Sequence, residues 1–272
     1  MKKLELAAQN VAYRESSGTD EPGFILIHGN SSSSRSFEKL LNGDIGNAHR
    51  VVALDLPGHG DSDPAPDPEA GYTMPGYARV IVEAAEALNM KNAIFVGWSL
   101  GGHIALEAVA HLPDAAGFVI FGTPPLAFPP AMDAAFLPNP NVGSAFNADL
   151  SDDEKRAFVE SFFKPGTTAI PENFIDDINK TENQARAIMG GSIQPDGYTD
   201  EVDIVADMTQ PLMIIHGAEE QLINGEYFAS LTMSTLWQDA VQIIDDAGHA
   251  PHYETPDEFA ARLLAFKADI TG

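Results

Sequence analysis

The sequence contains no cysteine, few basic residues and no long uninterrupted hydrophobic run. The absence of cysteine excludes disulfides, thiolate metal sites and a cysteine nucleophile, and it fits a protein of the reducing cytoplasm. No stretch approaches the length of a membrane span, and Met1–Leu6 lacks the continuous apolar region of an export signal. We therefore expect a cytoplasmic protein that does not enter a membrane.

Basic residues are far outnumbered, because 15 lysines and arginines stand against 40 aspartates and glutamates, for a net charge of −25. Such a charge repels phosphate backbones and anionic lipids, so we expect neither nucleic acid nor a membrane as a partner. We interpret it as a solvated acidic surface; a field that helps to expel an anionic product is the alternative. A small molecule is then the expected partner, and both a monomer and a homodimer are compatible with the sequence.

Short apolar runs alternate with helical patterns along most of the 272 residues, and a hydrophobic content of 44% is typical of a folded globular protein. After an exposed opening strand or hairpin over Leu4–Tyr13, buried strands are predicted at Phe24–Ile27, Arg50–Leu54, Ala93–Val96, Phe118–Phe121, Pro211–Gly217 and Val241–Ile244. The intervening helical patterns include Ser36–Leu41, Met74–Leu88, Leu100–His111 and Pro256–Phe266. This alternation predicts an α/β fold whose mostly parallel sheet is covered by helices on both faces.

The alternation stops after the sixth strand, at Gly122-Thr123-Pro124-Pro125. We predict a core domain over residues 1–122 and 209–272, and a helical cap inserted at 123–208. The insertion holds seven of the 15 phenylalanines, at positions 128, 136, 146, 158, 162, 163 and 174. Most are expected to form the insertion's own small core, but some would face down and line an acyl pocket. The candidates for that lining are Phe128, Phe136, Phe158 and Phe162.

A serine between two glycines, Gly97-Trp98-Ser99-Leu100-Gly101, joins a predicted strand to a predicted helix. A side chain at either glycine would collide with neighbouring backbone in such a sharp turn. The Ser99 hydroxyl is then exposed at the carboxyl edge of the sheet, where it is a candidate nucleophile. An ordinary strand-to-helix turn is the alternative, and Trp98 is either a pocket residue or a core residue.

Serine chemistry at neutral pH needs a base and an anion that orients the base. His249 lies in a glycine-containing loop after the last strand, and Glu220 lies just beyond the end of the strand before it. We predict His249 as the base and Glu220 as the acid. The alternatives are Glu219 or Asp246 for the acid and His252 for the base. The other histidines are expected to bond to loops (His28, His216) or to be packed or exposed on the helix after the serine (His103, His111).

A second loop, at His28-Gly29-Asn30 and the serines that follow, comes directly after a buried strand. A glycine followed by small polar residues lets backbone approach a ligand closely. The N–H groups of Asn30 and Leu100 are therefore the candidate oxyanion donors, and a plain serine-rich loop is the alternative. Asp55 and His59, in a loop with one proline and two glycines, are interpreted as structural.

Taken together, these motifs resemble the α/β-hydrolase fold over essentially the whole chain, including the order serine, acid, histidine. Four runs are similar to the metal-independent N-acyl-homoserine lactonases of that fold, in which the acid is a glutamate. They are His28-Gly29-Asn30-Ser31-Ser32-Ser33, Gly97-Trp98-Ser99-Leu100-Gly101-Gly102-His103-Ile104, Gly122-Thr123-Pro124-Pro125 and Asp246-Ala247-Gly248-His249-Ala250-Pro251.

The resemblance implies a hydrolase that opens the lactone ring of a quorum-sensing signal, with no cofactor and no metal. Ser99 would attack the ring carbonyl, His249 and Glu220 would complete the triad, and Trp98 and the cap phenylalanines would hold the acyl chain. Metal-dependent lactonases carry an H-x-H-x-D-H cluster, and no two histidines here stand two positions apart. A carboxylesterase, an acylase, a carbon–carbon hydrolase or a lactone-binding receptor with little turnover are the alternatives.

Overall fold

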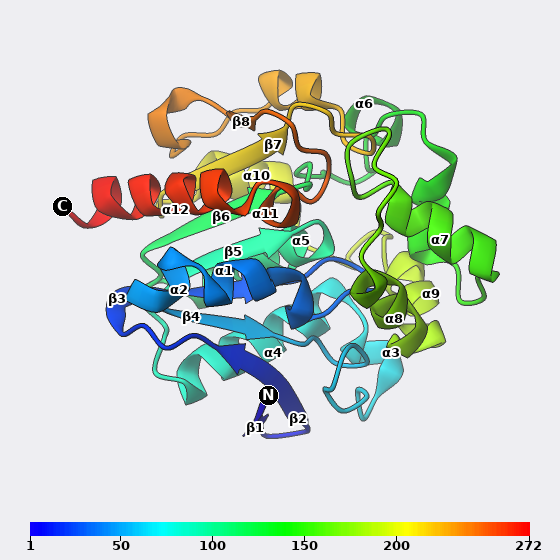
Figure 1. Cartoon of the computed structure of the whole chain (residues 1–272), viewed down its shortest axis with the longest axis horizontal. Helices are drawn as coiled ribbons and strands as arrows, with labels where there is room; N and C mark the ends of the chain where they lie inside the picture. Colours follow the sequence, from blue (N-terminus) through cyan, green and yellow to red (C-terminus); the bar gives the residue numbers. More distant parts are fainter.

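A computed structural model describes all of residues 1–272 (Figure 1). Eight strands form one sheet: β1 (Lys2–Glu5), β2 (Asn10–Glu15), β3 (Asp20–Ile27), β4 (His49–Leu54), β5 (Ile94–Trp98), β6 (Gly117–Phe121), β7 (Leu212–Gly217) and β8 (Gln242–Ile244). Their order across the sheet is β1-β2-β4-β3-β5-β6-β7-β8. The opening hairpin pairs antiparallel to its neighbours, and every other pair is parallel. The predicted fold class is confirmed.

Helices cover both faces of the sheet. The α-helices are α1 (Glu38–Asn42), α2 (Asp44–Ala48), α3 (Pro68–Gly71), α4 (Met74–Ala87), α5 (Leu100–Ala108), α6 (Met132–Ala135), α7 (Asp152–Glu160), α8 (Glu172–Lys180), α9 (Asn183–Gly191), α10 (Glu201–Asp207), α11 (Pro251–Glu254) and α12 (Pro256–Thr271). Short 3₁₀ turns are η1 (Ser34–Phe37), η2 (Val109–His111), η3 (Pro140–Phe146), η4 (Gly225–Ser230) and η5 (Trp237–Asp239). In Figure 1, α1, α2, α11 and α12 lie in front of the sheet, and α4, α5 and α10 lie behind it. None of the helices has the combination of length and apolarity that crossing a bilayer requires.

Three helix predictions change in detail. The stretch predicted as one helix at Ser36–Leu41 is the turn η1 followed by α1. The helix after the serine ends at Ala108 and tightens into η2, and the closing helix continues past Phe266 to Thr271. Helix ends are set by caps and tertiary contacts, so their positions are the part that periodicity predicts least well.

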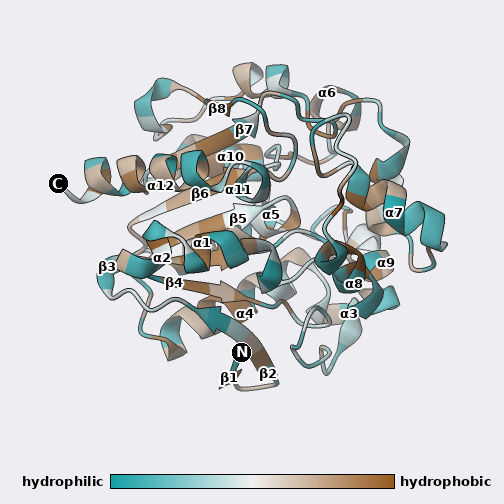
Figure 2. Cartoon of the chain, viewed as in Figure 1, coloured by the Kyte–Doolittle hydropathy of each residue, from teal (hydrophilic) through white to brown (hydrophobic).

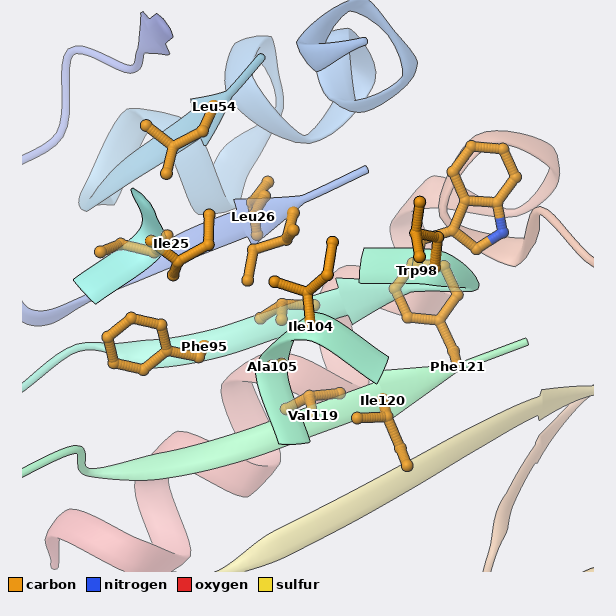
Figure 3. Packing of buried hydrophobic residues seen from close by; sticks show 14 of the residues in the cluster. Ile25, Leu26, Leu54, Phe95, Trp98, Ile104, Ala105, Val119, Ile120 and Phe121 are labelled. Atoms are coloured by element: carbon orange, nitrogen blue, oxygen red, sulfur yellow. The ribbon is translucent and has the colours of Figure 1, made fainter. Parts of the chain in front are cut away.

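The hydrophobic core runs along the central strands and into the helices on either side. Ile25, Phe95 and Val119, from three neighbouring parallel strands, are fully buried. Figure 3 shows them with Trp98 and Phe121 at the strand ends. Figure 2 shows the same arrangement at low magnification, with apolar strands inside and polar outer faces on the helices. Continuous apolar strands of this kind are buried on both faces of a parallel sheet.

The segment between β6 and β7 contributes helices and turns but no strand, and in Figure 1 helices α7, α8 and α9 lie beyond the arrowheads of the strands. Contrary to expectation, Phe158, Phe162, Phe163 and Phe174 do not form a separate small core, because they belong to the same hydrophobic cluster as the sheet. α10 packs against α5. The division into a core and a cap at 123–208 stays a prediction.

Candidate active site

Ser99 occupies a strained turn between β5 and α5. Its backbone has φ 53° and ψ −118°, a conformation that a non-glycine residue adopts at an energetic cost and that recurs at functional sites. A Cβ added at Gly97 would lie 2.3 Å from the Gly101 carbonyl oxygen, and one added at Gly101 would lie 2.2 Å from that of Ile27. The turn is fixed by the Ser99 N–H, which donates to the Phe121 carbonyl at 2.8 Å. The hydroxyl is thereby held at the carboxyl edge of the sheet.

His249 and Glu220 form a buried pair at the same edge. His249 Nδ1 lies 2.8 Å from Glu220 Oε2, and both side chains are only 2% exposed. The other carboxylate oxygen of Glu220 accepts the Leu222 N–H at 2.8 Å. Burial alone would raise the pKa of Glu220, but His249 and this N–H hold the pKa below its ordinary value. Glu220 is therefore an anion that fixes the tautomer with Nε2 free.

The loop that carries His249 is held from several sides. Trp98 Nε1–H donates to the His249 carbonyl oxygen at 2.8 Å. Gly122 has φ +60°, and a Cβ added there would lie 2.5 Å from His249 Cε1. Trp98 is 1% exposed and belongs to the core while it also lines the cavity, so both interpretations of this residue describe its position. Its hydrogen bond to the loop could not be predicted from the sequence, because it joins residues 151 positions apart.

The alternative acids and base lie elsewhere. Glu219 is exposed, and Asp246 is exposed and accepts a hydrogen bond from Lys164 Nζ at 2.9 Å. His252 is fully buried between aromatic rings, with 4.8 Å between its ring centroid and that of Trp98. Neither of its ring nitrogens has a hydrogen-bond partner, and it does not line the cavity.

The two residues predicted to supply oxyanion donors, Asn30 and Leu100, line the same cavity as Ser99. The Asn30 N–H makes no hydrogen bond within the protein, and Leu100 is the first residue of α5, where N–H groups lack intrahelical partners. The Asn30 side chain is engaged elsewhere, since its Nδ2 donates to the Ala145 carbonyl and its Oδ1 accepts the Ser31 hydroxyl. Ser99 Oγ makes no hydrogen bond to His249, although both residues line the cavity, and this contact is commonly loose before substrate binds.

A cavity that is partly open to solvent lies over these groups. Fifteen of its 20 lining residues are hydrophobic. Trp98, Phe136, Phe158 and Phe162 are among them, as expected, but Phe128 is not. Phe128 is instead 43% exposed, so its predicted place in the pocket is wrong. The prediction missed most of the aliphatic and methionine lining: Met74, Leu126, Met132, Val142, Ala145, Met189, Ile193, Leu222 and Ile223.

Of the other histidines, His28 bonds to a loop as predicted, because its Nε2 accepts the Leu56 N–H at 3.0 Å. His216 does not, since its Nδ1 is buried without a partner. His103 was expected to be merely packed or exposed, but it lines the cavity and pairs with Glu201. Asp55 accepts the N–H groups of Ser34 and Asp61, which agrees with a structural role. No group of three or more His, Asp or Glu side chains is arranged to hold a metal ion.

Comparison with known proteins identifies a family with this fold. The model of the alpha/beta hydrolase family matches residues 24–262. The crystal structure of N-acyl homoserine lactonase AidH complexed with N-butanoyl homoserine is 35% identical in sequence, covers 99% of this chain and 97% of its own, and superposes with a TM-score of 0.94.

Curated relatives are more distant. A pimeloyl-acyl-carrier-protein methyl ester esterase of Xylella fastidiosa is 26% identical, over 92% of this chain and 96% of the relative. A non-heme chloroperoxidase of Burkholderia pyrrocinia is 25% identical, over 94% of this chain and 95% of the relative. The parallel sheet, the strained serine turn and the match over residues 24–262 agree, and the chain belongs to the alpha/beta hydrolase family.

Proposed function

We propose that this protein is a serine hydrolase that opens the lactone ring of N-acyl homoserine lactones and so destroys a quorum-sensing signal. Ser99 is the nucleophile, His249 the general base and Glu220 the anion that orients it. The observation that supports a lactone substrate is the similarity to AidH. Its solved structures hold N-butanoyl homoserine and N-hexanoyl homoserine lactone. Ester-bond hydrolysis in general agrees with the family and with the methyl ester esterase relative.

In this mechanism Ser99 Oγ attacks the ring carbonyl carbon while His249 Nε2 takes the hydroxyl proton. The Asn30 and Leu100 N–H groups bind the oxyanion, a contribution for which the loss of one donor costs about 3–4 kcal/mol of transition-state stabilisation. The bond between the carbonyl carbon and the ring oxygen then breaks, and His249 returns the proton to that oxygen. An acyl-enzyme remains, tethered at Ser99.

Water completes the reaction. It attacks the ester carbonyl of the acyl-enzyme, gives a proton to His249, and releases Ser99 Oγ, which takes that proton back. The product is an N-acyl homoserine, whose carboxylate replaces the neutral lactone. The acyl chain would lie among the hydrophobic lining, which includes Trp98, Phe136 and Phe162, and residues 123–208 would act as the cap over it.

The deciding experiment is mass spectrometry of the products from a panel of N-acyl homoserine lactones beside simple esters. A lactonase adds one water to the substrate and leaves the amide intact, whereas an acylase frees homoserine lactone and a fatty acid. Hydrolysis of esters alone, with every lactone untouched, would contradict the proposal. Binding without turnover would indicate a receptor.

The same assay tests the role of Ser99 and whether the reaction needs a metal ion. Ser99→Ala should abolish ring opening without changing the melting temperature, because the hydroxyl lies at the edge of the cavity. Dialysis against a chelator should leave the rate unchanged. A loss of activity that added metal restores would exclude the proposed mechanism.

A further inference from the structure

Five residues of the cavity lining are not hydrophobic: Gly29, Asn30, Ser99, His103 and His249. The proposed chemistry uses Ser99 and His249 directly and the Gly29-Asn30 loop as oxyanion site. His103 is the polar lining residue left without a role. In a cavity that is otherwise apolar, one precisely placed polar group is what fixes the orientation of a ligand.

His103 lies in the first turn of α5, four residues after Ser99, which is the N-cap of that helix, and both residues line the cavity. Its Nδ1 lies 2.8 Å and 2.9 Å from the two carboxylate oxygens of Glu201 on α10. Glu201 is 1% exposed, and its Oε2 also accepts the Leu126 N–H at 2.8 Å. The imidazole ring is therefore held rigidly, with Nδ1–H donated to a buried carboxylate.

The other ring nitrogen of His103, Nε2, indicates a role in ligand binding. His103 Nε2 makes no hydrogen bond within the protein, although the residue is only 8% exposed. The hydrogen bond to Glu201 ties α10 to α5, but that structural task uses Nδ1 alone. A polar nitrogen at the edge of an apolar cavity is costly to desolvate unless a ligand supplies a partner. A ring whose one N–H proton is the Nδ1–H donated to Glu201 presents a lone pair at Nε2, and a lone pair needs an N–H or O–H donor.

We infer that His103 is a specificity-determining residue, which accepts a hydrogen bond from the amide N–H of the substrate, with Glu201 holding the ring. This inference deepens the proposed function and rests on it. In an N-acyl homoserine lactone the amide nitrogen is bonded to the carbon beside the scissile carbonyl. With that carbonyl carbon at Ser99 Oγ, the amide lies in the same cavity, which Ser99 and His103 both line. The enzyme would then distinguish acyl homoserine lactones from lactones and esters that carry no amide.

The test compares two lactones of equal shape, N-hexanoyl homoserine lactone and its analogue in which a CH₂ group replaces the amide N–H. We expect the wild-type enzyme to prefer the amide by about tenfold in kcat/KM, the usual effect of one hydrogen bond. In His103→Asn the side-chain NH₂ can still donate to Glu201, but nothing stands at the Nε2 position. The preference should fall to about one, mainly through KM, and the melting temperature should stay near that of the wild type.

His103→Gln is the matched variant, because its amide reaches the Nε2 position but not Glu201. It should retain part of the preference while melting at a lower temperature. A wild-type enzyme that opens both lactones equally well overturns the inference and leaves the proposed function standing, and this arm needs no variant. An unchanged preference in folded His103→Asn also overturns it. A wild-type enzyme that opens neither lactone overturns the proposed function itself.

Discussion

Glu220 is a carboxylate kept ionised inside the protein, and this single charge organises the proposed catalytic residues. It has one strong partner on each oxygen, His249 Nδ1 and the Leu222 N–H. Glu219, the next residue toward the N-terminus, has an exposed side chain, although its backbone N–H donates to the Ala247 carbonyl at 2.9 Å. The side chain of Glu220 is buried and that of Glu219 is exposed, so substitution of Glu219 is a matched control for substitution of Glu220.

Glu220→Ala should lower kcat/KM for lactone opening by at least about a hundredfold, because a triad without its carboxylate loses the tautomer and the orientation of the base, a loss that can approach 10⁴. Steady-state kinetics at pH 7.5 measures the loss. Glu219→Ala removes the same side chain from the solvent-facing position and should change the rate by less than about twofold. A reversed ranking of the two variants would transfer the role of the acid to Glu219.

At the scale of single residues, the sequence predicts those functional residues that belong to a local motif. Ser99, His249 and Glu220 follow from a strand end and a glycine-rich loop, and the structure brings all three to one edge of the sheet. Phe128 and His103 were misjudged because their environments depend on distant contacts. His103 meets a carboxylate 98 positions away on α10, and no local pattern encodes that meeting.

At the scale of elements, the segment after α7 and the last residue of α11 hold the His249 loop in place. Glu254 of α11 accepts the Gly248 N–H at 2.7 Å and the Lys164 N–H at 2.8 Å, so one carboxylate bridges the loop and the segment after α7. The Ala250 N–H donates to the Phe162 carbonyl at 2.8 Å. Burial raises the pKa of Glu254. The segment that was predicted as a cap therefore also positions the proposed base.

Glu254→Ala leaves two N–H groups without an acceptor, at a cost of about 1–3 kcal/mol each where they are buried. We expect a melting temperature lower by roughly 4–8 °C and a rate lower by about tenfold, because His249 is no longer held in place. Differential scanning calorimetry and lactone kinetics measure the two effects. Glu258→Ala, which removes an exposed partner of Arg262 on α12, should change neither by much. A full rate in Glu254→Ala would show that the remaining contacts, Trp98 among them, suffice to hold the loop.

The sequence predicts strands and helices well where they are buried, and poorly where their positions depend on contacts with other elements. The strands β5 and β6 and the second half of β3, Phe24–Ile27, are largely apolar runs because both of their faces are covered. In the segment between β6 and β7, phenylalanines pack onto the main core rather than onto one another alone. Such packing depends on which elements lie next to one another in space. The order of residues along one helix does not specify these neighbours.

For the whole molecule, two features respond to acid in opposite ways. The net charge of −25 destabilises the compact state by self-repulsion, and protonation of surface carboxylates relieves it. Burial, by contrast, lowers the pKa of His28 to about 4 and that of His59 to about 3. Burial also lowers the pKa of His252 well below its ordinary value, and nearby His249 and Lys39 add to this shift. These rings are neutral in the folded chain but take up protons once the chain unfolds.

The sign of the histidine effect follows from proton binding. Between the pKa of the free imidazole, near 6.5, and the lower pKa in the folded chain, the unfolded state binds more protons, so the free energy of unfolding decreases as the pH falls. Above about pH 6.5 both states are neutral and the effect vanishes. Because charge relief acts in the opposite direction, the pH dependence of the wild-type protein alone does not isolate the histidines.

A variant that removes one buried imidazole isolates it. His252 packs among Phe37, Trp98 and Phe121 with both nitrogens unpartnered, so His252→Leu exchanges an unsatisfied polar ring for an apolar side chain of similar volume. We expect the variant to be at least as stable as the wild type at pH 7.5. Its advantage should grow by on the order of 2 kcal/mol at pH 5, since each pH unit below the free pKa contributes about 1.4 kcal/mol. Thermal unfolding of both proteins from pH 7.5 to 5 measures the difference, in which surface charge relief cancels. A constant difference across that range would mean that His252 accepts a proton in the folded chain as readily as in the unfolded one.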